Sequence, residues 1–271
     1  MPELPEVETT RSGIAHHIIN QPVRSVTVRQ SRLRWQVPRS LKQELPGHFF
    51  HAVTRRGKYL LLSSDAGTLL IHLGMSGSLR ILPGTSPVRK HDHIDLQFES
   101  GSILRFTDPR RFGCMLWFKS DPMNHPLLTD LGPEPLSMDF DGHYLKARSR
   151  HKKQAIKNFI MDSKVVVGVG NIYANEALFA SGIRPGKAAG RITLARYQLL
   201  AEKIKAILHQ AIKLGGTTLR DFTDSDGQPG YFSQSLMVYG RDRQLCRVCN
   251  QPIRVSRLGQ RSTFYCPHCQ A

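Results

Sequence analysis

The chain has 271 residues, and its 38 lysines and arginines outnumber its 21 aspartates and glutamates, which gives a formal net charge of +17. Apolar residues make up 40% of it, a share that excludes a largely disordered protein, and the length suits two domains. The positive surplus predicts a polyanionic partner, most simply nucleic acid. An anionic membrane surface is the alternative, but no apolar run approaches the roughly 18–20 residues that span a bilayer, and no basic amphipathic helix dominates.

The chain opens Met1-Pro2-Glu3-Leu4-Pro5. An initiator Met before a small residue is normally removed, which leaves Pro2 with a free secondary amine. Its pKa of about 8 keeps a useful fraction unprotonated, and such amines attack carbonyl-like carbons to form Schiff bases. Glu3 places a general acid or base beside it. The plainer alternative is a helix that begins at Pro5, with the nearby glutamates favoured by the helix dipole.

After a helix expected over residues 5–19, short apolar runs follow, divided by Gly, Pro and Ser clusters. This spacing predicts a β-sandwich or barrel. A Gly/Pro-rich hinge at residues 131–136 then separates the strands from helices expected at Lys152–Met161, Asn171–Ser181 and Thr193–Gly215. The segment from Gly215 to Ser233 is rich in Gly, Thr, Ser and Asp, which fits either a plain linker or a loop that closes over a bound base.

Two Cys-x-x-Cys pairs lie near the C-terminus: Cys246, Cys249, Cys266 and Cys269. Each pair can chelate from one tight turn, and together they complete a tetrahedron. We expect one structural Zn²⁺, because four protein ligands leave no position for a reactive water. Disulfides are the alternative, and they are rare in reducing cytosol.

Two basic residues are candidates for phosphate contacts. Lys58 precedes an apolar strand, and Arg261 lies at the tip of a hairpin expected between the cysteine pairs. Taken alone, both positions are better explained as solvated surface charges.

Enzymes that act on a base within duplex DNA extrude it, and apolar side chains can fill the gap. Met75 and Phe112 lie in Gly- and Pro-punctuated turns, and Arg110 is placed to hydrogen-bond the orphaned base. The alternative is that Met75 and Phe112 belong to the core and that Arg110 is a surface charge.

His91, His93 and Asp95 alternate, which suggests a metal site, but no further ligand is evident and we do not favour it. His91 and Lys152 are generic phosphate contacts on charge alone. Asn171 opens an expected helix, where it is either a backbone-phosphate contact or a simple helix cap. The preceding Gly-x-Gly lacks the third glycine of a dinucleotide fingerprint, so that interpretation is rejected.

These motifs resemble the formamidopyrimidine-DNA glycosylases (the Fpg or MutM family), base-excision repair enzymes that open with the same residues. The related endonuclease VIII (Nei) group typically has Gly where Leu4 stands. The resemblance covers essentially the whole chain. It implies an α+β fold with an N-terminal β-sandwich and leading helix, then a helix–two-turn–helix domain with a zinc-ribbon hairpin.

The resemblance also implies residue roles. Pro2 would be the nucleophile and Glu3 the proton donor, with Lys58 and Arg261 assisting elimination. DNA contacts would fall on six positions: Met75, His91, Arg110, Phe112, Lys152 and Asn171. The expected division is a catalytic domain at 1–132, a hinge at 133–149, a helical DNA-binding domain at 150–228 and the zinc hairpin at 229–271.

The function expected from the resemblance is a bifunctional DNA glycosylase/AP lyase that excises oxidised purines from double-stranded DNA. We expect a monomer in the cytoplasm, associated with the nucleoid, with no membrane partner. Two alternatives stay open here: a Nei-like specificity for oxidised pyrimidines, and a non-catalytic, zinc-stabilised DNA-binding protein.

Overall fold

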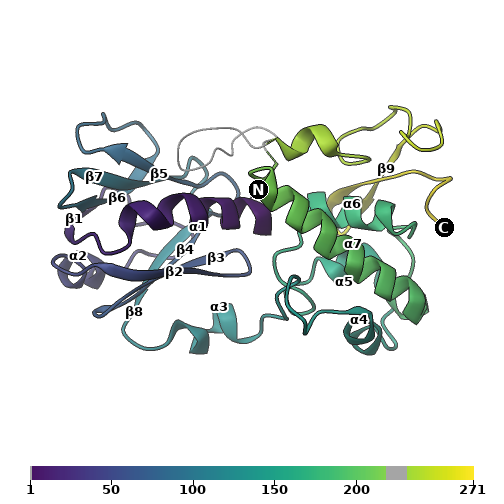
Figure 1. Ribbon diagram of the computed structural model, residues 1–271, viewed down its shortest axis with the longest axis horizontal. Helices are drawn as coiled ribbons and strands as arrows, with labels where there is room; N and C mark the ends of the chain where they lie inside the picture. Colours follow the sequence, from purple (N-terminus) through teal and green to yellow (C-terminus); the bar gives the residue numbers. More distant parts are fainter. Residues whose placement is uncertain (1, 218–230) are drawn as a thin grey trace. The chain divides into compact units, whose positions relative to one another are not determined.

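A computed structural model describes residues 2–217 and 231–271, and the chain forms two compact units (Figure 1). The first unit combines residues 1–129 with 214–233, and the second combines 130–213 with 234–271. The described residues 214–217 and 231–233 are thus grouped with the strands of the first unit. The two units are described separately below.

The first helix, α1 (Leu4–Ile18), begins one residue before the expected Pro5. Pro5 occupies its first turn, where the missing proline N–H costs no helical hydrogen bond. One stripe of the helix, which includes Val7, Ile14 and Ile18, is buried in the core of the first unit. This burial fixes the N-terminal end of the chain against the sandwich.

Eight strands of the first unit form two antiparallel four-stranded sheets with the orders β1-β6-β7-β5 and β2-β3-β4-β8. Their bounds are β1 (Val23–Val28), β2 (Phe50–Arg56), β3 (Tyr59–Ser64), β4 (Gly67–His72), β5 (Ser78–Pro83), β6 (Asp92–Phe98), β7 (Ser102–Thr107) and β8 (Cys114–Phe118). Residues from both sheets, among them Phe50, Leu62, Phe98 and Phe106, share one core. The β-sandwich is confirmed. Two short helices, α2 (Ser40–Glu44) and α3 (Pro126–Thr129), complete the unit.

The second unit is mainly helical, with α4 (Gly142–Arg148), α5 (Ile156–Ile160), α6 (Asn171–Ala180) and α7 (Leu194–Lys213). Thr193 precedes α7 as expected, and its Oγ1 accepts a hydrogen bond from the N–H of Arg196 at 3.4 Å. The helix expected from Lys152 is wrong at its start. Ala155 is extended and forms a β-bridge with Ala188, so the helical turn begins only at Ile156.

The C-terminal hairpin consists of β9 (Arg254–Leu258) and β10 (Arg261–Tyr265). Gly259 and Gln260 connect the strands with φ values of +54° and +62°. Positive φ at both central residues is what a type I′ turn requires, and this turn matches the twist of a two-stranded ribbon. Leu258 therefore pairs directly with Arg261, which fixes where the arginine leaves the hairpin.

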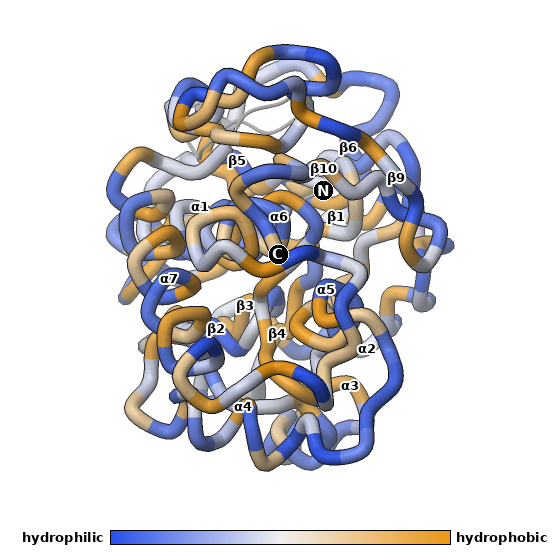
Figure 2. The backbone as a smooth tube through the Cα atoms, turned by 90° about the vertical axis from the view of Figure 1, so that its right-hand side faces the viewer, coloured by the Kyte–Doolittle hydropathy of each residue, from blue (hydrophilic) through white to orange (hydrophobic). Residues whose placement is uncertain are grey.

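Hydrophobic and hydrophilic residues are interleaved along the chain (Figure 2). Within residues 2–217 and 231–271, none of the helices combines the length and the apolar character that crossing a bilayer demands. The buried apolar residues instead serve the internal cores.

A matched pair of methionines tests the core of the first unit. Met115 in β8 is 1% exposed, whereas Met123 is 40% exposed. We expect Met115→Ala to lower the free energy of unfolding by about 2–5 kcal/mol through the cavity that it leaves. Met123→Ala should cost less than about 1 kcal/mol. Urea unfolding curves of both variants measure these free energies of unfolding, and equal decreases for the two variants would contradict this assignment of the core.

Candidate active site and nucleic-acid contacts

The N-terminal site is built on the first turn of α1. Pro2 is buried and Glu3, 2% exposed, is the residue that caps the helix. The backbone N–H of Glu3 donates to Glu6 Oε2 at 2.8 Å, and Glu6 Oε1 accepts from the N–H of Thr217 at 2.7 Å. One buried carboxylate therefore fixes the backbone beside Pro2 and also holds the residue that precedes segment 218–230. The opening is therefore a capped helix start, as the plainer alternative predicts, and a helix start of this kind would also hold the amine of Pro2 rigidly.

Lys58 lies at the turn between β2 and β3, and this turn is tied to α1. Arg55 donates to Glu8 Oε2 at 2.8 Å and to the carbonyl of Gly57 at 2.9 Å. Burial alone would raise the pKa of Glu8, but hydrogen bonds from Arg55 and Arg11 outweigh it and hold that pKa below its ordinary value. Glu8 therefore stays ionised at neutral pH and links α1 to the Lys58 turn.

His72 is a residue near Lys58 that the sequence analysis missed. Its pKa is lowered to about 4, first by burial and then by the positive charges of Lys58 and Arg34. Its ring lies 4.8 Å from that of Tyr59, and its Nδ1 accepts from the N–H of Gly74 at 3.0 Å. The ring is therefore neutral at pH 7, with its proton on Nε2. The pairing of Tyr59 with His72 across the β3–β4 hairpin is the signal that would have located it.

Met75, Arg110 and Phe112 lie on two loops of the first unit. Met75 is 38% exposed and Phe112 is 44% exposed, so neither belongs to the core. The guanidinium carbon of Arg110 lies 4.8 Å from the centre of the Phe112 ring, a distance at which cation–π attraction acts. The loops thus present two apolar side chains and one cation at the surface.

The alternating residues 91, 93 and 95 have separate structural environments. His91 precedes β6 and is partly exposed, which suits a surface contact. His93 is buried, and its Nε2 donates to the carbonyl of Asp108 at 2.8 Å. Asp95 accepts hydrogen bonds from Arg29 and Arg105. Among the residues that the structure describes, the four cysteines form the only cluster with metal-ligand geometry.

Lys152 and Asn171 are in the second unit. Lys152 is exposed in a turn. The cap of α6 is Gly170 rather than Asn171, so the interpretation of Asn171 as a simple helix cap is wrong. Instead its Nδ2 donates to the carbonyl of Ser262 at 3.1 Å, and its buried Oδ1 has no partner among the described residues.

Arg261 is exposed at the first position of β10. The strand that carries it is held by two helices. Lys157 of α5 is fully buried and donates to the Ser262 carbonyl at 2.8 Å and to Thr263 Oγ1 at 2.7 Å, and Asn175 of α6 accepts from the N–H of Phe264 at 2.8 Å. Lys157 was missed because its partners lie more than 100 residues away.

The sulfur atoms of Cys246, Cys249, Cys266 and Cys269 all lie within 4.8 Å of one another, and none of the four is in a disulfide. A tetrahedral zinc with Zn–S bonds of about 2.3 Å needs sulfurs about 3.8 Å apart. The Cys249–Cys266 and Cys246–Cys269 separations of 3.4 and 4.0 Å bracket this value. The donor set fits one structural Zn²⁺ with four thiolate ligands, as expected from the spacing.

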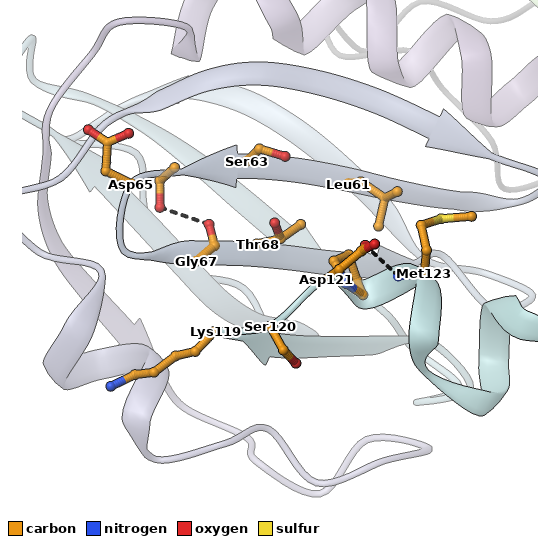
Figure 3. Close-up of a pocket in the computed structure, with 11 residues that line it drawn as sticks. Leu61, Ser63, Asp65, Gly67, Thr68, Lys119, Ser120, Asp121 and Met123 are labelled. Atoms are coloured by element: carbon orange, nitrogen blue, oxygen red, sulfur yellow. Dashed lines mark hydrogen bonds between the residues drawn. The ribbon is translucent and has the colours of Figure 1, made fainter.

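A separate pocket of about 350 Å³ lies at the β3–β4 turn and the chain after β8 (Figure 3). It is lined mainly by polar side chains, among them Ser63, Asp65, Thr68 and Lys119. None of the predicted site residues contributes to it. We therefore do not assign it to the candidate active site.

The predicted site residues fall into two groups. The first unit carries Pro2, Glu3, Lys58, Met75, His91, Arg110 and Phe112, and the second carries Lys152, Asn171, Arg261 and the four cysteines. The loop expected to close over a base lies largely in residues 218–230, outside the described residues.

Comparisons with known proteins agree along the chain. Family models match at residues 1–115 (formamidopyrimidine-DNA glycosylase N-terminal domain), 131–223 (formamidopyrimidine-DNA glycosylase H2TH domain) and 243–271 (zinc finger found in FPG and IleRS). A formamidopyrimidine-DNA glycosylase from Nitrosococcus oceani is 57% identical over 270 residues, covering 100% of both chains.

Two solved structures of the Lactococcus lactis Fpg protein are similar over 99% of both chains. A variant in complex with DNA containing Fapy-dG has a TM-score of 0.93 at 33% identity. A complex with DNA containing an abasic site has a TM-score of 0.92 at 34% identity. Each of these proteins therefore shares the fold of this chain.

The pKa of His72 predicts a pH dependence of stability. Between the ordinary value of 6.5 and about 4, the unfolded chain binds a proton that the folded chain does not, so stability falls as the pH decreases through this window. The loss should amount to about 1–3 kcal/mol because the ring is only partly exposed. Urea midpoints from pH 7 to pH 4 should show a smaller slope for His72→Gln than for the unchanged protein. Identical slopes would exclude His72 as the source.

Metal analysis tests the cysteine site. We expect one zinc per chain, bound by about 10–16 kcal/mol, and Cys266→Ser should lower the zinc content well below one because the remaining three thiolates bind less tightly. Cys114→Ser is the matched control, since Cys114 lies in β8, in the other unit. Zinc loss from both variants alike would contradict the four-cysteine assignment.

Proposed function

The chain belongs to the formamidopyrimidine-DNA glycosylase family and is a DNA glycosylase of base excision repair, and from this premise we propose that it removes oxidised purines through its N-terminal proline. The observation that carries the proposal is the fixed backbone position of Pro2. It directly precedes the capped start of α1, with Glu3 buried beside it and the backbone held by Glu6.

Base release begins with the amine of Pro2, freed by removal of Met1. The unprotonated nitrogen attacks C1′ of the flipped nucleotide, the bond from C1′ to the base breaks with its electron pair leaving on the base, and the base takes up the proton that the nitrogen loses. Glu3 donates a proton to the sugar oxygen as the ring opens. A secondary amine then gives an iminium with no nitrogen proton to lose, so the intermediate stays cationic and withdraws electrons.

Strand cleavage follows from this electron sink. The iminium acidifies the C2′ hydrogens, so loss of one of these protons expels the 3′ phosphate by β-elimination, and a second elimination expels the 5′ phosphate. Lys58 and Arg261 assist these steps by neutralising phosphate charge. Zinc orders the hairpin that carries Arg261 and takes no part in bond breaking.

Recognition of the duplex is assigned to the exposed residues. Met75 and Phe112 fill the gap left by the flipped nucleotide, Arg110 hydrogen-bonds the orphaned base, and His91, Lys152 and Asn171 contact the backbone. The partner is double-stranded DNA with oxidised purines such as 8-oxoguanine and formamidopyrimidines, or with abasic sites. We propose a monomer that acts in the cytoplasm at the nucleoid, since one chain carries every residue assigned a role.

Borohydride trapping tests the nucleophile. The processed protein should become covalently linked to lesion-containing duplex DNA, whereas a chain that keeps an N-terminal tag should give no adduct because its Pro2 nitrogen is an amide. Mass spectrometry verifies Met1 removal. Excision of oxidised purines by the tagged chain at the full rate would overturn the mechanism.

The Glu3→Gln variant separates base release from reaction of Pro2 with an abasic site. We expect base release to fall by about 10²–10⁴-fold, the range for loss of a general acid. Trapping on a preformed abasic site should persist, because the aldehyde of an abasic site needs no base to leave. Equal loss of both activities would contradict the role given to Glu3.

A further inference from the structure

Asp108 is a fully buried carboxylate outside the reacting centre. It directly follows β7 and begins the loop that carries Arg110 and Phe112, next to the loop that carries Met75. Its Oδ1 accepts from the hydroxyl of Ser76 at 2.8 Å and from the N–H of Arg110 at 3.3 Å. Its Oδ2 accepts from the N–H of Gly113 at 2.8 Å. One side chain thus receives donors from both loops.

The backbone of Asp108 is fixed as well. Its carbonyl accepts from His93 Nε2 at 2.8 Å and from the N–H of Arg111 at 3.2 Å. Arg111 has a φ of +56°, a left-handed conformation that non-glycine residues adopt at a cost. The bonds around Asp108 hold the loop through this unfavourable point, between Arg110 and Phe112.

The two loops also pack backbone to backbone. A Cβ atom on Gly74 would lie 2.4 Å from the carbonyl carbon of Phe112 and from the nitrogen of Gly113. No side chain fits in that space. The hydrogen bond from Ser76 to Asp108 therefore adds to a backbone contact that leaves no gap between the loops, so a shift of one loop would move the other.

We propose that Asp108 is a positioning residue that locks these two loops into one rigid wedge, which keeps Met75, Arg110 and Phe112 at a fixed spacing before DNA is bound. The inference rests on the proposed function, because a wedge matters only where a base leaves a duplex. Preordering the loops spares the entropy that separate, mobile loops would lose on insertion.

The hydrogen-bonding capacity of the Asp108 carboxylate explains why the isosteric asparagine should not hold the two loops together. An ionised aspartate is acceptor-only and can serve all three donors. An asparagine keeps one oxygen but turns an N–H group toward either the Gly113 N–H or the Ser76 and Arg110 donors. Placing donor against donor in a buried site leaves both unsatisfied.

The experiment compares Asp108→Asn and Ser76→Ala with a matched control. Ser64→Ala removes a hydroxyl that is also 8% exposed and donates to the Gly67 carbonyl at 2.9 Å, away from both loops. Two reactions are measured: excision of an oxidised purine from duplex DNA, which needs the wedge, and borohydride trapping on an abasic site in single-stranded DNA, which does not. A 2-aminopurine placed opposite the lesion reports insertion by its fluorescence.

We expect Asp108→Asn to slow duplex excision by about 10- to 100-fold, in the range for unsatisfied buried donors, and Ser76→Ala by about 3- to 10-fold, in the range for loss of one hydrogen bond. Both should lower the 2-aminopurine signal, while single-stranded trapping stays within about twofold of the unchanged protein. Ser64→Ala should match the unchanged protein in all three assays. In a Met75→Ala background, the effect of Asp108→Asn should shrink, because both changes act through one wedge.

Duplex excision at the unchanged rate in Ser76→Ala and Asp108→Asn would overturn the proposal. So would parallel loss of duplex and single-stranded activity in a folded Asp108→Asn protein, since Asp108 would then act on the chemistry. If Asp108→Asn does not fold, the Ser76→Ala result decides alone. Absence of trapping by the unchanged protein would instead refute the proposed function.

Discussion

The hydrogen bonds of the Glu6 carboxylate are the constraint on which the N-terminal segment of the molecule depends. A buried carboxylate is tolerated only when its oxygens are satisfied, and here one oxygen holds the Glu3 N–H while the other holds the Thr217 N–H. Hydrogen bonds to a charged group contribute about 1.5–3 kcal/mol each. Glu6 thereby converts the end of a chain, ordinarily its most mobile part, into a fixed point of the fold.

The same device recurs elsewhere in the chain. Glu176 of α6 is 4% exposed, and its carboxylate accepts from the N–H groups of Met237, Val238 and Tyr239 at 2.8–3.0 Å. Burial raises its pKa against the opposing effect of these hydrogen bonds. Glu6 and Asp108 in the first unit, and Glu176 and Lys157 in the second, are all buried polar side chains that fix a loop or hairpin by hydrogen bonds. Irregular backbone is made rigid by polar groups where sheets and helices do not reach.

Patterns local in sequence predicted much of this structure. Short apolar runs divided by Gly, Pro and Ser predicted the strands, the family resemblance specified the sandwich, and the spacing of the cysteine pairs predicted the zinc site. Failures have one physical cause, which is that the deciding contact is distant along the chain. Ala155 leaves the helical pattern to bridge Ala188, and Asn171 reaches Ser262 instead of capping its own helix. Lys157 and Asp108 escaped notice for the same reason, since Lys157 meets Ser262 and Asp108 meets Ser76 across the fold.

The close approach at Gly74 also bears on how such a surface can diverge. The side chains at the tips of the two loops are exposed to solvent, so the fold tolerates their exchange because no core packing depends on them. The base of the loops does not tolerate such exchange, since any side-chain atom added at Gly74 would collide with the neighbouring backbone. Substitutions in this part of the molecule are therefore confined to the exposed tips: related sequences can change the side chains that the loops present, while the rigid backbone contact beneath them stays the same.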